Sequence, residues 1–250
     1  MIIDTHCHLS KQDYDVDNYI KEAIKSSVKY LIVSGCTKDS IIESIDIAKK
    51  YKNVLLTIGF HPTENITDED LIFLKDCIKS NKIIGIGEIG LDYHYDNTNK
   101  INQQKYFEKQ LKIAKEFNLP VVIHSRDAFL DTYNILKKYN VKGIIHCFGG
   151  SYEEAVKYIE LGFKIGIGGI VTFKNSDLDK VVEKIGINNI VLETDSPYLA
   201  PTPVRGSINT SKNLVHIVSK ISDIIGISYD EVCDITTKNT IELFDLKNLL

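Results

Sequence analysis

The chain alternates short apolar runs with longer amphipathic segments along nearly its whole length. The apolar runs have the length of buried strands, and they predict strands over residues 2–5, 30–34, 54–59, 83–88, 120–124, 143–146, 163–168 and 189–195. Apolar residues at helical spacing predict helices over residues 16–26, 38–50, 68–80, 101–117, 127–138, 152–161, 177–185 and 211–225. Each predicted strand is therefore followed by a predicted helix.

Strand–helix repetition of this kind predicts an α/β fold. A length of 250 residues allows one large barrel or two modest domains. The alternation continues without a Pro- or Gly-rich linker, which favours a closed (β/α)8 barrel, a TIM barrel, over a doubly wound sheet. We expect one domain over residues 1–250, with a barrel core of about 1–226. An extra C-terminal helix over about 228–246, capped by Ser228, is expected to pack on the outside of the barrel.

Composition and charge exclude several classes of protein. The chain is 43% hydrophobic and 26% charged, and no apolar run approaches the roughly 18 to 20 residues that span a bilayer. Its five cysteines are an odd number without a CxxC pair, which is typical of a reducing compartment. We therefore predict a cytoplasmic protein with no membrane contact. A net charge of −4 argues against broad nonspecific binding to duplex DNA.

Barrel enzymes carry their chemistry at the carboxyl ends of the strands, so the polar residues at these positions are the candidates. His6 and His8 follow the first strand and alternate to the same side, whereas Cys7 is expected to face the core. Cys147 is expected to face the core as well. Four histidines and two carboxylates at strand ends are enough for two divalent ions. The predicted ligands are His6, His8 and Asp195 for one ion, His124 and His146 for the other, and Glu88 as the bridge.

The residues at these strand ends form six motifs that resemble the TatD family of metal-dependent deoxyribonucleases, in the amidohydrolase-like superfamily. The motifs are Asp-Thr-His-Cys-His-Leu (4–9), Gly-Phe-His-Pro (59–62), Gly-Glu-Ile-Gly-Leu-Asp (87–92), His-Ser-Arg-Asp (124–127), His-Cys-Phe-Gly-Gly (146–150) and Glu-Thr-Asp-Ser-Pro-Tyr-Leu (193–199). The resemblance covers essentially the whole chain. It implies Mg, Mn or Zn ions and hydrolysis of phosphodiester bonds in DNA, often as a 3′ exonuclease.

The only two arginines among thirty basic residues are Arg126 and Arg205, and both are expected on the catalytic rim. A planar guanidinium suits phosphate, so both are candidate substrate-binding residues. Members of the family commonly carry a second basic residue and a proline after Arg205, where this chain has Ser207 and Ser211. We therefore expect weaker phosphate binding at this loop.

The expected reaction uses a metal-activated water, with Glu88 bridging the ions and Asp195 as ligand and general base. His61 is a candidate to protonate the leaving oxygen or to bind phosphate, and Glu193 is a candidate to orient a ligand. The expected substrate is a single strand or a strand end of DNA, and no obligate protein partner is evident.

Two alternatives belong to other classes. A small-molecule amidohydrolase or esterase could direct the same water at a carbonyl carbon. Barrels of that kind often bridge their metals with a carboxylated lysine on the fourth strand, whereas this chain offers Glu88, which favours the phosphodiesterase. A metal-dependent scaffold without activity would predict a lost ligand, and all six ligands are present.

Overall fold

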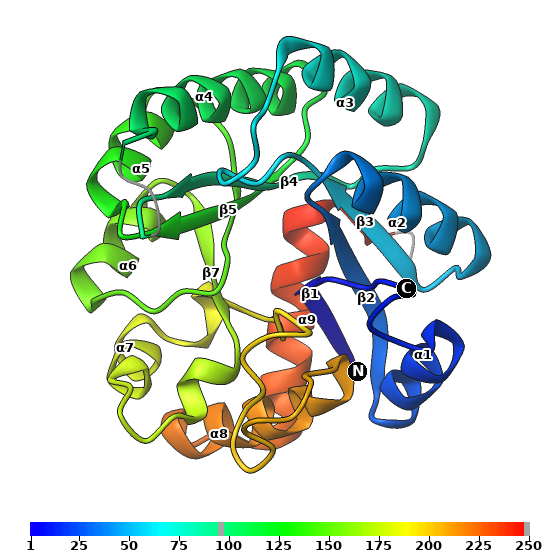
Figure 1. Ribbon diagram of the computed structural model, residues 1–250. Coiled ribbons are helices and arrows are strands. Elements are labelled where there is room, and N and C mark those ends of the chain that lie inside the picture. The colour runs from blue at the N-terminus through cyan, green and yellow to red at the C-terminus, as the bar shows by residue number, and fades with distance from the viewer. Residues whose placement is uncertain (95–97, 248–250) are drawn as a thin grey trace.

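The computed structural model describes residues 1–94 and 98–247. Eight parallel strands pair in chain order around a barrel, and helices surround them (Figure 1). The strands are β1 (Ile2–Cys7), β2 (Val28–Gly35), β3 (Val54–Ile58), β4 (Gly85–Asp92), β5 (Val121–Arg126), β6 (Gly143–Ile145), β7 (Phe163–Ile167) and β8 (Ile190–Leu192). The predicted (β/α)8 barrel is confirmed.

The helices follow the strands in the predicted order. They are α1 (Val16–Lys25), α2 (Lys38–Lys50), α3 (Asp68–Ser80), α4 (Lys100–Glu116), α5 (Phe129–Leu136), α6 (Tyr152–Glu160), α7 (Leu178–Ile185), α8 (Leu214–Ile225) and α9 (Tyr229–Phe244). Short 3-10 turns at Gly169–Thr172, Ile187–Asn189 and Ser211–Asn213 join β7, α7, β8 and α8. Ser228 caps α9 as predicted, because its hydroxyl accepts a hydrogen bond from the Glu231 amide.

Two strand ends differ most from the sequence prediction. β4 runs on to Asp92, because it stays paired with β5 up to Arg126. β8 ends early, at Leu192, and Asp195 then adopts a left-handed backbone with φ of 53°, which lies outside the conformation of a regular strand.

The seam between β8 and β1 closes the barrel through individual hydrogen bonds. The Asp195 amide donates to the His6 carbonyl at 3.0 Å, and the His8 amide donates to the Ser196 carbonyl at 2.8 Å. The Thr5 hydroxyl donates to the Leu192 carbonyl at 2.9 Å. Barrel closure therefore fixes the backbone of three predicted ligands relative to one another.

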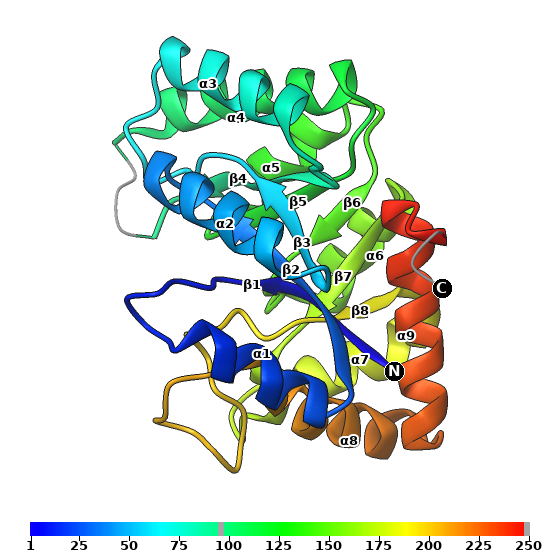
Figure 2. The same ribbon diagram turned by 90° about the vertical axis from the view of Figure 1, so that its right-hand side faces the viewer.

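Helix α9 lies across the amino-terminal end of the barrel (Figure 2), not on its outside as the sequence suggested. Its end residues Ile241, Leu243 and Phe244 form one buried cluster with apolar residues from six strands and with Ile84, which directly precedes β4. The strand residues of this cluster are Ile3, Ile32, Leu55, Val122, Ile144 and Val191. An amphipathic pattern predicts an apolar face but not the surface that the face covers, which explains the difference.

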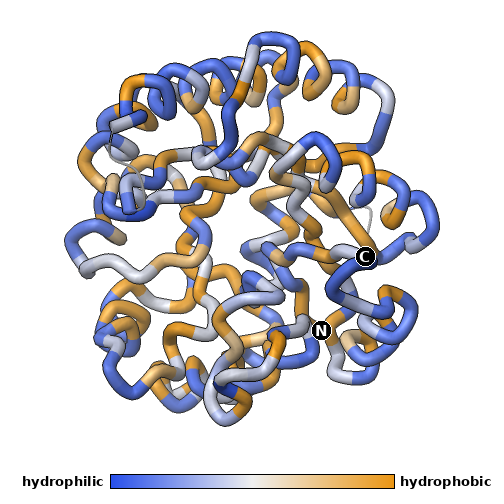
Figure 3. Tube along the Cα trace, in the orientation of Figure 1, coloured by the Kyte–Doolittle hydropathy of each residue, from blue (hydrophilic) through white to orange (hydrophobic). Residues whose placement is uncertain are grey.

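The larger apolar core lies between the strands and the surrounding helices, whose outer faces are hydrophilic (Figure 3). Helix α9 closes one end of the barrel, and the opposite end, at the carboxyl ends of the strands, is polar. Over residues 1–94 and 98–247, no helix combines the length and the apolar character that a membrane crossing needs. Localisation in the cytoplasm stays a prediction.

Candidate metal centre

Three of the predicted ligands meet where β1 and β8 end. His6 Nε2 lies 3.2 Å from His8 Nε2, and the two nitrogens lie 3.6 and 3.5 Å from Asp195 Oδ1. The strand alternation predicted that His6 and His8 share a side, and the structure confirms this placement. The three donor atoms face one common point, as ligands of a single cation do.

Glu88 joins this group to the other two histidines. Its Oε1 lies 2.7 Å from both His124 Nδ1 and His146 Nε2. Its Oε2 lies 3.4 Å from His6 Nε2 and 3.6 Å from His8 Nε2. One carboxylate therefore faces both halves of the centre, which is the geometry that a bridging ligand requires.

Close packing of β4 against β5 places this carboxylate. A Cβ on Gly87 would lie 2.5 Å from Val122 Cβ and 2.8 Å from the Val122 carbonyl oxygen. Only glycine therefore allows β4 to approach β5 so closely beside Glu88. The Glu88 side chain therefore starts from a point where β4 packs closely on β5.

Contacts at the far ring nitrogens of three histidines indicate which nitrogen of each of these three faces the centre. His8 Nδ1 lies 3.2 Å from the Ser34 carbonyl, and His124 Nε2 lies 3.0 Å from Asp92 Oδ2. His146 Nδ1 lies 3.6 Å from Glu193 Oε1. Histidines that bind metals are generally oriented by such partners. His124 therefore presents Nδ1 to Glu88, whereas His8 and His146 present Nε2.

Glu193 is fully buried and also accepts a hydrogen bond from the Cys147 amide. A Cβ on Gly166 would overlap the Glu193 carboxylate, so the glycine leaves the space that this side chain occupies. The sequence interpretation gave Glu193 an orienting role, and its position behind His146 suits that role.

Two groups of the centre, Glu88 and His146, shift the pKa values of each other. Burial opposes ionisation of Glu88, but the imidazoles of His146 and His124 outweigh it and hold the pKa of Glu88 well below its usual range. Burial likewise opposes protonation of His146, but the Glu88 carboxylate outweighs it and raises the pKa of His146. Glu88 and His146 therefore stabilise the charged forms of each other.

The donor set fits divalent cations. Imidazole nitrogens and carboxylate oxygens are ligands for zinc, manganese and magnesium. The Nε2 atoms of His6 and His8 face each other at 3.2 Å, where a shared cation would satisfy both lone pairs. The residues that would hold the ions are His6, His8 and Asp195 on one side, His124 and His146 on the other, and Glu88 between them.

His61 lies beside these six residues. Its Nε2 is 3.5 Å from Glu88 Oε1. Its Nδ1 lies 2.6 Å from the Thr63 hydroxyl and accepts a hydrogen bond from the Thr63 amide at 3.3 Å, and an amide can only donate. The ring proton is therefore on Nε2, directed at the centre. Burial lowers the pKa of His61 to about 4, so the ring is neutral at neutral pH. A neutral imidazole can donate a hydrogen bond to phosphate, but it is a poor source of a proton for the leaving oxygen.

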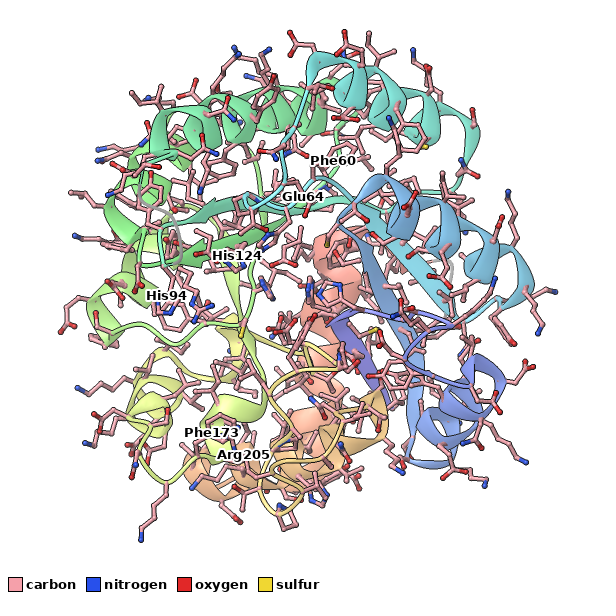
Figure 4. The ribbon with its side chains drawn as sticks, in the orientation of Figure 1. Phe60, Glu64, His94, His124, Phe173 and Arg205 are labelled. Carbon is pink, nitrogen blue, oxygen red and sulfur yellow. The ribbon has the colours of Figure 1, made fainter. Side chains whose placement is uncertain are left out.

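Both arginines lie on the rim, as the sequence indicated. Arg126 is the exposed last residue of β5 and is in register with Asp92 of β4. Arg205 is exposed on the loop after β8, and its guanidinium carbon lies 3.8 Å from the centre of the Phe173 ring. Figure 4 shows Arg205 and Phe173 together, on the other side of the barrel mouth from His124.

Sequence reasoning missed three contributions to the site. Asp92 ends one of the six motifs but was given no role, although it contacts His124. Cys36 directly follows β2, and its thiol lies 3.6 Å from Glu88 Oε2. The strand-end rule that found the histidines could have found both. Phe173, which supports Arg205, had no such signal, because its partner comes from another loop.

The remaining cysteines near the centre differ from each other. Cys7 is buried, and its thiol donates to the Ile32 carbonyl at 3.7 Å, in keeping with the predicted core position. Cys147 is only half-buried and lies beside the Asp195 carboxylate, so its predicted core position is wrong. Burial raises the pKa of Cys147, and this carboxylate adds to the effect. Neither thiol belongs to a group of three potential metal-binding side chains within the described ranges.

Comparisons with known proteins agree with this geometry. The profile of the family described as "TatD related DNase" matches residues 3–245. YabD of Bacillus subtilis strain 168, named an uncharacterized metal-dependent hydrolase, is 38% identical over 252 residues, covering 98% of this chain and 99% of YabD. YcfH of Escherichia coli strain K12, named in the same way, is 34% identical over 254 residues, covering 98% of this chain and 96% of YcfH. The crystal structure of YJJV, a TatD homolog from E. coli K12, matches with a TM-score of 0.93 at 28% identity over 98% of each chain.

Proposed function

Because this chain belongs to the TatD family of metal-dependent hydrolases, we propose that it hydrolyses phosphodiester bonds in DNA with two divalent ions. The substrate is a single strand or a strand end, and removal of nucleotides from the 3′ end is the expected mode. The observation that carries the proposal is the position of Glu88, whose two oxygens face two separate groups of nitrogen donors. Binuclear centres of this kind suit the in-line displacement of a phosphodiester.

When bound, divalent ions lower the pKa of water and neutralise charge on phosphate oxygens. The residues of this chain do the rest. Asp195 accepts the proton of the attacking water, and the histidines next to it support this role. Although burial opposes ionisation, His8 and His146 keep the pKa of Asp195 below its usual range, so the carboxylate is available as a base.

Three further side chains bind the substrate phosphate in this proposal. His61 donates a hydrogen bond from Nε2 to a non-bridging oxygen, in the neutral form that its pKa of about 4 implies. Arg126 and Arg205 offer paired N–H donors to the phosphates on either side of the barrel mouth. The stacking of Arg205 on Phe173 limits the positions that its guanidinium can take.

A small-molecule amidohydrolase or esterase is the second candidate. It would use the same nitrogen and carboxylate donors, and a carboxylated lysine on the fourth strand is common in that class. β4 carries Glu88 and contains no lysine. This difference supports the phosphodiesterase, as does the pair of arginines on the rim.

Digestion of a single-stranded oligodeoxynucleotide labelled at its 5′ end tests the proposal. The protein is stripped of metal and assayed with magnesium, manganese or zinc, and with EDTA. We expect a ladder of products with a divalent ion and none with EDTA. The Asp195→Asn protein, purified in the same way, controls for contaminating nucleases.

The pattern of products also gives the polarity, because removal from the 3′ end shortens the labelled strand one nucleotide at a time. If the metal-loaded protein cleaves no oligonucleotide, the proposal is wrong. A panel of esters and amides then tests the second candidate.

A further inference from the structure

One aromatic side chain stands at the mouth of the barrel without an assigned role. Tyr198 lies on the loop after β8 and is 61% exposed. Its ring centre is 6.2 Å from that of His8, and the two rings are nearly perpendicular, at 68°. Tyr198 is therefore adjacent to a predicted metal ligand while most of its surface remains open to a ligand.

The position of this apolar surface is unusual within the described residues. Most other large exposed hydrophobic side chains lie on helices of the outer layer. These are Ile24, Ile42, Ile72, Ile101 and Leu130, on α1 to α5 in turn. Tyr198 and Ile208 are the members of the set on the loop between β8 and α8. An exposed aromatic ring beside a polar centre suits contact with a ligand.

Hydrogen bonds hold the backbone of this loop in place. The Tyr198 amide donates to the Asp195 carbonyl at 2.9 Å. The fully buried Asn209 side chain donates to the carbonyls of Tyr198 and Thr194 at 2.7 and 2.9 Å. The Tyr14 hydroxyl donates to the Asn209 carbonyl at 2.6 Å. The ring of Tyr198 therefore starts from a fixed position, and little backbone ordering is needed when a ligand binds.

We infer that Tyr198 forms a nucleobase subsite, on which one of the two bases flanking the scissile phosphate stacks. This inference rests on the proposed function and adds the part of the substrate that lies beyond the phosphate. A phosphate held at the centre lies beside His8, and a base is attached to it through one sugar, so the base reaches the ring next to His8. Base–aromatic stacking accepts every base, because each base has a π-face.

The subsite selects unpaired nucleotides. A base inside a duplex stacks on its neighbours and is not free to stack on a protein ring, whereas a base in a single strand or at a frayed end is free. Arg205 lies on the same loop and is the candidate contact for a neighbouring phosphate of the same strand.

The test compares substrates with and without the base. The substrates are short single strands in which a single phosphodiester is cleavable and all others are phosphorothioates. In two further substrates, the nucleotide on one or the other side of that bond is replaced by an abasic tetrahydrofuran residue. The readout is the ratio of kcat/KM for the complete substrate to that for each abasic substrate.

We expect the wild-type ratio to be about tenfold for one of the two positions, with the difference mostly in KM. Tyr198→Ala should bring this ratio close to one, and Tyr198→Phe should retain it, because the ring and not the hydroxyl stacks. Ile208→Ala is the matched control: it removes an exposed apolar side chain from the same loop and should leave the ratio unchanged.

Three results would overturn the inference. If the wild type cleaves the complete and abasic substrates equally, or if Tyr198→Ala keeps the wild-type ratio, no base stacks on Tyr198, while the nuclease function stands. If the wild type cleaves none of the substrates with any divalent ion, the proposed function fails and the subsite fails with it.

Discussion

Replacement of Asp92 by asparagine should change the orientation of the predicted ligand His124 without removing any predicted ligand. Asp92 Oδ2 lies 3.0 Å from His124 Nε2, and Asp92 Oδ1 accepts a hydrogen bond from the His94 amide at 2.9 Å. Asp92 is only 3% exposed, so water cannot replace this contact easily. A carboxylate there requires the ring proton on Nε2 and leaves the lone pair of Nδ1 for a cation.

Asparagine has the same shape but can offer its N–H2 group to Nε2. It can do so without losing the hydrogen bond from His94, because its carbonyl oxygen takes the place of Oδ1. The ring proton then moves to Nδ1, which faces Glu88 at 2.7 Å. A protonated nitrogen cannot ligate, so His124 would have to give up this contact before an ion could bind.

Loss of such a partner typically weakens metal binding by about 10- to 100-fold, or about 1.4 to 2.8 kcal/mol. We expect this loss for the ion held by His124, His146 and Glu88, with little change for the other ion. Calorimetric titration of the metal-free protein with manganese or zinc measures both affinities.

Asp127→Asn is the matched control, because Asp127 is exposed on the same rim and contacts His94, 2.8 Å away, instead of a predicted ligand. It removes the same unit of charge and should alter both affinities by less than about twofold. If Asp92→Asn binds two ions as tightly as the wild type, the tautomer argument is wrong.

Three further predictions concern the ions, the floor of the barrel and the rim. Burial opposes protonation of His124 and His146, but nearby carboxylates outweigh it and raise the pKa values of both rings, so an ion must displace protons from them. The affinity of the protein for divalent ions should therefore rise from about pH 6 to 8, and calorimetry should detect proton release on binding. Affinity that is independent of pH would contradict this. Phe244→Ala should lower the free energy of unfolding by about 3 to 5 kcal/mol in urea titrations, because Phe244 is buried in the cluster that closes the amino-terminal end of the barrel. A loss below about 1 kcal/mol would refute the stabilising role of this cluster. Phe173→Ala should raise KM for oligonucleotides about two- to fivefold at constant kcat, because Arg205 loses its stacking partner, and an unchanged KM would contradict this.

The order of elements and the positions of the candidate ligands were predictable because both follow from periodicity and topology. Parallel strands in a barrel end on one rim, so a histidine directly after a strand is placed there wherever it lies in the sequence. His6 and Glu88 are far apart in the chain, yet their side chains lie 3.4 Å apart. Ligation of metal by these residues stays a prediction.

Features that depend on tertiary packing were not predictable from one sequence. The apolar face of α9 could cover either the outer helices or the end of the barrel, and only the assembled strands provide the second surface. The contact between Asp92 and His124 depends on β4 staying paired with β5 beyond its predicted end. The stacking of Arg205 on Phe173 joins two loops that have no regular pattern.

Digestion of DNA in water enriched in oxygen-18 is the most direct test of the central claim, which is water attack on phosphorus at the Glu88 centre. The metal-loaded wild type should release nucleotides that carry one heavy oxygen in each newly formed phosphate, and Glu88→Gln should release none. Nucleotide release by Glu88→Gln at the wild-type rate, or wild-type products without the heavy oxygen, would contradict the account.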